Sequence, residues 1–446
     1  MVLFKSLKNI FYIKELRSKI LFILGILIIY RLGNHIPVVG IDVNALSELM
    51  KQSSTLGGLF SYLDIFSGGN LRYSTIFSLG IMPYISASIM MQILSMSVPY
   101  LEQLTKEGEY GRKIINQYTR YLTVGISVFQ ASVYAGVLEK SGVVLAPGWG
   151  FRFLFILSLT VGTLFVMWLG EQISLYGIGN GTSIIIFAGI VARFPADIFK
   201  VIENVRQGFM SPLIAILLVV VFLFILATIV YLEKGERKIP VQYARRVVGQ
   251  RVYGGQSTYI PFKINSAGVM PVILAGAFLN IPLFLITWLS GKFAFFTNLA
   301  LWIGPGTFFF DLIQFFLIIA FSYFYTALIF DPVKLSEDIK KSGGFVPGLR
   351  PGKKTAEFFN YILTRLGLVG AVYLGFLVIL PSILQRLLQF VTGSQVMIPR
   401  GIFSGTGLLI VIGVALELAA QIEAYLIEHR YEGFLSSGRM KGRTAR

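Results

Sequence analysis

The chain has 446 residues, 55% hydrophobic and 14% charged, with a mean hydropathy of +0.73. Soluble globular proteins carry about 25% charged residues, so this composition excludes an ordinary soluble domain and indicates a polytopic membrane protein. The net charge is +17, cysteine is absent and there are two histidines, which excludes a disulfide framework, a thiolate redox site and a His-rich metal site.

Residues 1–18 are expected to form an amphipathic helix on the cytoplasmic face of the membrane. Basic side chains alternate there with apolar ones at Leu3, Phe4, Leu7, Ile10, Phe11 and Ile13. The apolar segment that follows, 20–30, has no signal-peptide cleavage pattern at its end. We therefore expect it to remain as the first spanning helix.

Apolar segments recur along the whole chain and are long enough to cross a bilayer as helices. Ten are predicted, at about 19–36, 74–98, 118–138, 151–169, 182–200, 212–231, 266–289, 308–330, 363–380 and 405–427. With the N-terminus inside, most Lys and Arg residues fall in cytoplasmic segments, as the positive-inside rule requires. Both termini are therefore predicted to be cytoplasmic, with a basic tail at 430–446.

The stretch 59–98 is interrupted in a way that is typical of a transporter or channel pathway. A short apolar helical face comes first, at Leu59, Phe60, Leu63 and Phe66. Gly68 and Gly69 then break it, because glycine does not continue a helix cheaply. The spanning helix that follows carries Gly80 and Pro83.

An internal repeat links two of the predicted spans. Gly80 to Ile85 reads GIMPYI and Gly268 to Ile273 reads GVMPVI, with four identities in six positions. Each motif opens the second span of a half of five, and the two spans run in opposite directions. The repeat therefore indicates halves of inverted topology around a central pathway; a chance match is the alternative, since glycine and proline are common in membrane helices.

Two predicted cytoplasmic loops, 232–265 and 331–362, combine basic residues with structure of their own. The first mixes Arg237, Arg245, Arg246 and Arg251 with β-branched and aromatic residues, which predicts a projecting hairpin. The second has a turn-rich tip around Arg350. Such loops could bind an acidic protein face, ribosomal RNA or lipid head groups; the simpler alternative is charge that only sets topology.

No enzyme motif is present: the Zn-protease, P-loop and nucleophile-elbow patterns are all missing. A secondary transporter is the stronger rival, because it also uses inverted repeats and broken helices. Ion-coupled transport usually needs ionisable groups within the membrane, and Glu417 is the clearest one here. An apolar pathway favours instead a channel for a large, variable cargo that seals by packing.

Several long motifs, in the same order along the chain, resemble the bacterial SecY family of protein-conducting channels. They include FSGGNLRYSTIFSLGIMPYISASI, GEYGRKIINQYTRY, MWLGEQISLYGIGNGTSIIIFAGIVA, FYTALIFDP and KKSGGFVPGLRPGKKTAEF. The resemblance implies an all-α polytopic membrane protein of ten transmembrane helices, in two inverted-topology halves of five at 19–205 and 206–429. It also implies a short plug helix at about 59–73, with Gly68 and Gly69 as its hinge.

The resemblance further implies the residues of each site. The pore ring falls on Ile81, Ile85, Ile186, Ile190, Ile273 and Ile410. The plug includes Leu59, Phe60, Leu63, Phe66, Gly68 and Gly69, and the lateral gate includes Pro83, Gln92, Gly268 and Pro271. Docking of a motor or ribosome falls on Arg350, Arg237, Arg245, Arg246 and Arg251.

The partners that the family implies are the SecE and SecG subunits, the SecA ATPase, the translating ribosome, signal peptides and nascent chains, with YidC and SecDF as further candidates. The channel needs no cofactor of its own. The expected location is the cell inner membrane, where the lipid bilayer receives segments released sideways between the second and seventh spans.

Overall fold

The computed structural model describes residues 13–46, 68–208, 210–243, 246–248, 251–253, 257–290, 293–304, 307–392 and 405–436. Most of the predicted surface helix at 1–18, the plug residues Leu59, Phe60, Leu63 and Phe66, and the end of the basic tail lie outside the described residues. The first described helix, α2 (Lys14–Gly33), begins five residues before the predicted first span.

Each of the ten predicted spans contains a helix, and the mainly helical membrane fold is confirmed. The predicted second span, 74–98, is helical only from Met82, because residues 74–81 form mainly turns. After α2 come α5 (Met82–Ser97), α7 (Glu109–Lys140), α8 (Trp149–Tyr176), α9 (Gly181–Val191) with α10 (Phe194–Arg206), α11 (Pro212–Lys234), α12 (Met270–Ser290), α14 (Phe308–Ile329), α16 (Lys353–Thr392) and α17 (Gly405–Ser436). By length and apolar composition alone, six helices among the described residues could cross a membrane, or seven when α5 is joined to α6 (Pro99–Lys106), which bends from it by 99°.

The fifth predicted span is two helices rather than one. Asn180 caps α9 by accepting hydrogen bonds from the backbone N–H groups of Thr182 (3.0 Å) and Ser183 (3.4 Å). The helix ends at Val191, and α10 restarts with Pro195 in its first turn. A proline within a helix lacks the N–H that would donate to the carbonyl four residues earlier, here that of Val191, and its ring clashes with that carbonyl, so α9 ends there.

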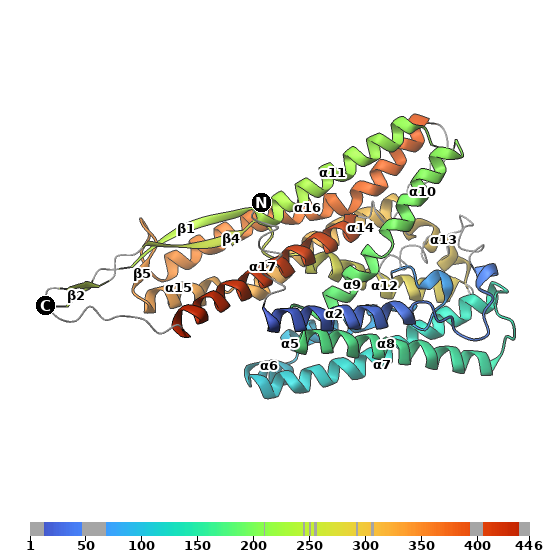
Figure 1. The fold of residues 1–446 in the computed structure, drawn as a ribbon, viewed down its shortest axis with the longest axis horizontal. Helices are drawn as coiled ribbons and strands as arrows, with labels where there is room; N and C mark the ends of the chain where they lie inside the picture. Colours follow the sequence, from blue (N-terminus) through green and yellow to red (C-terminus); the bar gives the residue numbers. More distant parts are fainter. Residues whose placement is uncertain are drawn as a thin grey trace.

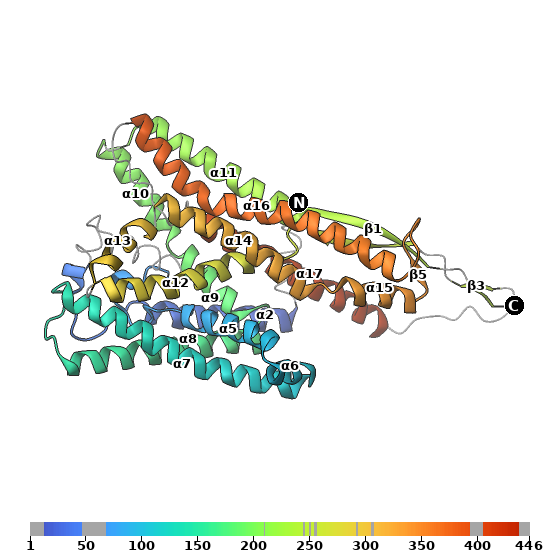
Figure 2. The same ribbon diagram turned by 180° about the vertical axis from the view of Figure 1, so that it is seen from behind.

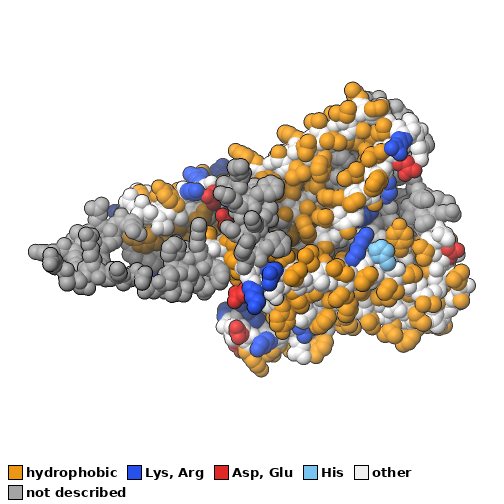
Figure 3. Space-filling model, in the orientation of Figure 1, with side chains coloured by type: hydrophobic (Ala, Val, Ile, Leu, Met, Phe, Trp, Pro, Cys, Tyr) orange, Lys and Arg blue, Asp and Glu red, His pale blue; other side chains and the backbone are white. Residues whose placement is uncertain are grey.

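The helices form two groups that meet along a central cluster (Figures 1 and 2). One group contains α2, α5, α7 and α8, and the other contains α11, α14 and α16. α9, α12 and α17 lie between them. Hydrophobic side chains cover most of the helical body in Figure 3, as expected where lipid replaces water as the solvent.

The predicted hairpin is confirmed and is part of a larger sheet. β1 (Glu236–Tyr243) pairs antiparallel with β4 (Ser257–Lys263), so that Ile239 lies opposite Ile260. β1 also pairs with β5 (Gly344–Phe345) from the other basic loop, which gives the order β4-β1-β5. A second ladder joins β2 (Arg246–Val248) to β3 (Arg251–Tyr253).

Under this sheet lies a separate hydrophobic cluster. Alternate residues of β1 face it, as the period of a strand requires. Its buried members come from β1, β4, α15 (Pro332–Lys341), the segment after β5 and the start of α16: Ile239, Val241, Phe262, Ile339, Val346, Phe359, Ile362 and Leu363. The two predicted docking loops therefore share one core with the end of α16.

This shared core predicts how the loops respond to a cavity. Replacing Phe359, which is fully buried, by alanine should cost about 3–5 kcal/mol of local stability. Trypsin should then cut the loops 232–265 and 331–362 faster than in the native protein. Tyr361→Ala, at an exposed site on the same helix, is the control and should leave both cleavage rates unchanged. Equal cleavage of the Phe359→Ala and native proteins would show that the loops do not depend on this core.

Candidate pore and lateral gate

The six isoleucines predicted for the pore ring lie in one hydrophobic cluster. Their exposed fractions are between 0% and 7%. The cluster also draws buried side chains from α2 and α8, at Ile26, Tyr30, Val166, Leu169 and Ile173. Residues from six predicted spans are thus brought to one place, which spacing along the sequence could not establish.

The two halves of the repeat have the same local backbone. Gly80 and Gly268 both have positive φ, 55° and 62°, a region that favours glycine. Each donates its backbone N–H to the carbonyl three residues earlier, at 2.8 Å and 3.4 Å. The helix then begins two residues later, with Pro83 or Pro271 at its second position, where a proline needs no hydrogen-bond partner.

These two turns lead into helices that pack against each other. α5 and α12 are in contact, and residues of both belong to the central cluster. Pro83 and Pro271 are buried, whereas Gln92 and Gly268 are half-buried. The four residues predicted for the lateral gate therefore lie on or beside one helix pair.

A polar cavity of about 380 Å³ borders the cluster at the start of α9; we name it the Arg120 cavity. Ile85, Ile186 and Ile273 form part of its wall. Its polar lining comprises Tyr84, Ser88, Gln92, Asn116, Arg120, Glu171, Ser174, Asn180, Thr182 and Ser183. Arg120 and Glu171 form a bidentate ion pair across it, with N···O distances of 2.7 Å and 3.0 Å.

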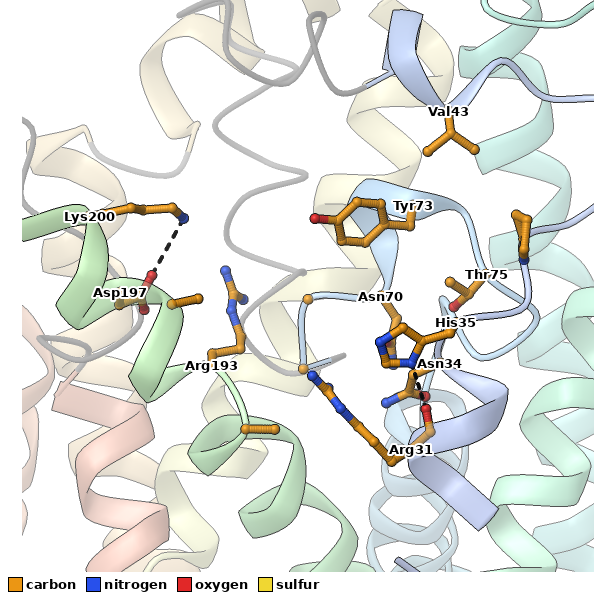
Figure 4. A pocket seen from close by; sticks show the side chains of 15 residues that line it. Arg31, Asn34, His35, Val43, Asn70, Tyr73, Thr75, Arg193, Asp197 and Lys200 are labelled. Atoms are coloured by element: carbon orange, nitrogen blue, oxygen red, sulfur yellow. Dashed lines mark hydrogen bonds and ion pairs between the residues drawn. The ribbon is translucent and has the colours of Figure 1, made fainter. Parts of the chain in front are cut away.

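A second cavity, of about 510 Å³, lies at the other end of α9; we name it the Arg193 cavity (Figure 4). Arg31 and Arg193 extend toward it from α2 and from the start of α10. His35 contacts the backbone oxygen of Arg31 through Nδ1 at 2.9 Å, and the Lys200 ammonium lies 3.6 Å from the carboxylate of Asp197. The lining of this cavity therefore includes three cationic side chains, at Arg31, Arg193 and Lys200, and two amides, at Asn34 and Asn70.

α9 runs from one cavity to the other. Asn180 lines the first and Arg193 the second, and the 11 residues of the helix between them span about 16 Å at 1.5 Å per residue. Ile186 and Ile190 lie within that length. Two polar cavities are thus separated by a packed apolar layer.

The predicted hinge borders the Arg193 cavity. Gly68 and Gly69 have φ values of 72° and 94°, a conformation that other residues adopt only with strain. A Cβ atom on Gly68 would lie 2.9 Å from the Cα atom of Gly189 in α9, closer than packed atoms allow. The close approach of this turn to α9 therefore depends on glycine at position 68. The remaining predicted plug residues lie outside the described residues.

The predicted docking residues divide between described and undescribed parts. Arg350 and Arg237 are exposed, and the pairing of β1 with β5 brings their two loops into one sheet. Arg246 and Arg251 lie in β2 and β3. Arg245 lies outside the described residues.

Sequence reasoning missed the Arg120–Glu171 pair and the Arg193 cavity. A signal for the first was available, because Arg120 and Glu171 lie at the same ends of two neighbouring antiparallel spans. The second depends on Arg31, Asn70 and Arg193 coming together from distant segments. Among the described residues no cluster of three or more His, Cys, Asp and Glu is placed to bind a metal.

Comparison with known proteins gives a consistent result. A sequence model of the SecY family matches residues 75–419. The protein translocase subunit SecY of Thermus thermophilus is 44% identical over 98% of this chain and 99% of its own. Two solved structures share the fold, each at 17% identity over 95% of both chains: one described as a protein-conducting channel (TM-score 0.66), the other the channel of a canine ribosome complex from the endoplasmic reticulum (TM-score 0.60). The chain belongs to the SecY family.

Proposed function

We propose that the chain is the pore-forming subunit of a protein translocase, passing unfolded secretory chains across the membrane. The observation that carries the proposal is the isoleucine layer between the Arg120 and Arg193 cavities. Water and ions do not cross a packed layer of branched apolar side chains, because such a constriction dewets. A polypeptide can part the layer, since dispersion contacts are non-directional and re-form against any side chain.

The pore ring consists of Ile81, Ile85, Ile186, Ile190, Ile273 and Ile410. Their common burial in one cluster supports this assignment. The two halves, 19–205 and 206–429, close around the ring, and the segment 59–73 acts as a plug hinged at Gly68 and Gly69. The channel works without a cofactor.

A lateral gate opens between α5 and α12, so that a transmembrane segment of the cargo leaves directly into lipid. The matching turns at Gly80 and Gly268 support this, because they let both helices begin beside the ring. Pro83 and Pro271 leave no backbone N–H to be re-paired when the helices separate. Gln92 lines the Arg120 cavity on the α5 side of the gate.

The protein lies in the cell inner membrane with both termini and the β4-β1-β5 sheet in the cytoplasm. Arg350, Arg237, Arg245, Arg246 and Arg251 bind the SecA motor or the ribosome, because arginine can hold a carboxylate or phosphate through two parallel hydrogen bonds. The ribosome complex of the canine structure supports the second partner. SecE and SecG complete the channel, and YidC and SecDF are further candidate partners.

Crosslinking tests the pathway directly. A photoreactive amino acid at position 81 or 273 should crosslink to an arrested secretory chain in membrane vesicles, because both side chains lie in the cluster through which the cargo passes. Position 28, at an exposed site on α2, is the control and should not react with the arrested chain. If the arrested chain crosslinks at neither position 81 nor position 273, the proposed pathway is contradicted and the alternative of a secondary transporter is favoured.

Polar substitution of the ring should impair the seal. Ile81→Ser, Ile190→Ser and Ile410→Ser each remove a buried branched side chain and place a hydroxyl in the apolar layer. Ion conductance in planar bilayers should rise several-fold and weak signal sequences should be accepted more readily. Ile28→Ser, at a surface position, should behave like the native channel. Native conductance in all three ring variants would remove the assignment.

Charge reversal at the loop tip tests docking. Arg350→Glu should reduce SecA-driven export of a secretory precursor at least tenfold, since the side chain is exposed and a repulsive contact replaces a charge-assisted hydrogen bond. The amount of channel in the membrane should not change. Lys106→Glu on the separate helix α6 is the control for added negative charge. Native export rates in Arg350→Glu would rule out this role.

A further inference from the structure

The Arg120 cavity contains a charged pair that the pore and the gate do not explain. Among the described residues that line it, Glu171 is the one carboxylate and Arg120 the one cation. The other polar residues are neutral amides and hydroxyls. Any charged group that enters this space must therefore interact with one member of the pair.

The two members differ in burial. The Glu171 side chain is 23% exposed and that of Arg120 is 52% exposed. The guanidinium lies on the water side and the carboxylate lies deeper. Arg120 can swing into water at little cost, whereas Glu171 without a cation would be a poorly solvated charge.

This asymmetry selects the sign of the ligand. An entering cation can replace Arg120 on Glu171 and release the guanidinium to solvent. An entering anion would take Arg120 away and leave the carboxylate of Glu171 unpaired in the cavity. The site therefore favours a lysine or arginine side chain over an acidic one.

The cavity also has a defined place beside the helix pair. Gln92 comes from α5 and Met270 from the start of α12, so the cavity opens toward the line along which these helices meet. Ile85, Ile186 and Ile273 close its other end. An apolar segment lodged between α5 and α12 would carry its flanking residues into this space.

Apolar segments that enter a membrane keep their basic flank on the cytoplasmic side. We propose that the Arg120 cavity binds this flank: Glu171 accepts the lysine or arginine that precedes the apolar segment of the cargo, in exchange for Arg120. The inference rests on the proposed function and adds a recognition site to it. The amide groups of Gln92 and Asn116 and the hydroxyls of Thr182 and Ser183 are available to the extended backbone of the same flank.

The test compares precursors that differ only in the flank. One precursor has two lysines before its apolar segment, and the other has two glutamines. In the native channel the lysine precursor should be exported faster. Glu171→Gln should lower the ratio of the two rates about tenfold, the effect of losing one charge-assisted hydrogen bond.

The chain offers a matched control. Glu139 and Arg152 form a second pair between α7 and α8, at the opposite ends of the same helices, with Arg152 Nε 2.8 Å from Glu139 Oε2. Glu139→Gln should keep the ratio at its native value. If Glu171→Gln slows both precursors equally, or changes neither, the carboxylate does not read the flank and the proposal is overturned.

Exchanging the two residues separates recognition from simple pairing of the helices. Arg120→Glu combined with Glu171→Arg restores the ion pair but puts a cation at the deeper position. A precursor with two glutamates in its flank should then be exported faster than the lysine precursor. If the double variant instead restores the native preference for lysine, the pair only joins α7 to α8 and the proposal fails.

Crosslinking shows which idea has failed. If the arrested chain reacts at positions 81 and 273 but Glu171→Gln leaves the ratio of the two export rates unchanged, the proposed channel is supported and the proposed recognition site is ruled out. If the arrested chain reacts at neither position, both the proposed function and the recognition site that rests on it are contradicted.

Discussion

The packing of branched apolar side chains between two polar cavities is the constraint on which the rest of the structure depends. A membrane protein whose cavities open to opposite sides must interrupt water without a rigid wall. In the channel that we propose, the interruption is the cluster of isoleucines from α9, α12, α17 and the start of α5, none more than 7% exposed. Hydrogen bonds or ion pairs at this depth would fix the helices, because breaking them leaves unsatisfied groups in a low dielectric. Dispersion contacts carry no such penalty.

The local geometry of α5 and α12 follows from their place beside this isoleucine cluster. To reach the cluster, α5 and α12 begin within the body of the protein. The first N–H groups of each helix have no acceptor within the helix, and there they must be satisfied away from bulk water. A glycine in a left-handed turn followed by a proline meets this need at Gly80 and Pro83 and again at Gly268 and Pro271. The glycine adopts the left-handed turn and the proline removes one donor. The same backbone turn therefore occurs twice, at the start of each of the two helices that meet beside the central cluster.

Two charged pairs lie in the cavities on either side of the apolar layer. Arg120 and Glu171 neutralise each other in one cavity, and Lys200 and Asp197 lie close in the other. At the far end of the molecule the basic loops are ordered by a separate core that includes Val241, Phe262 and Phe359. The basic loops and the isoleucine cluster are thus held by separate hydrophobic cores.

The sequence by itself determined what depends on neighbours along the chain. Hydropathy predicted all ten helical segments, basic residues predicted their orientation, and the short match between Gly80 and Gly268 pointed to the helix pair that meets in space. Motif resemblance predicted the six isoleucines of the cluster, although composition gave no reason to choose them among the many others. Only the tertiary structure decided that β1 pairs with β5 and that Arg120 faces Glu171. Periodicity and composition are local sums, whereas these features are contacts between distant residues, and their free energy exists only after the helices have packed.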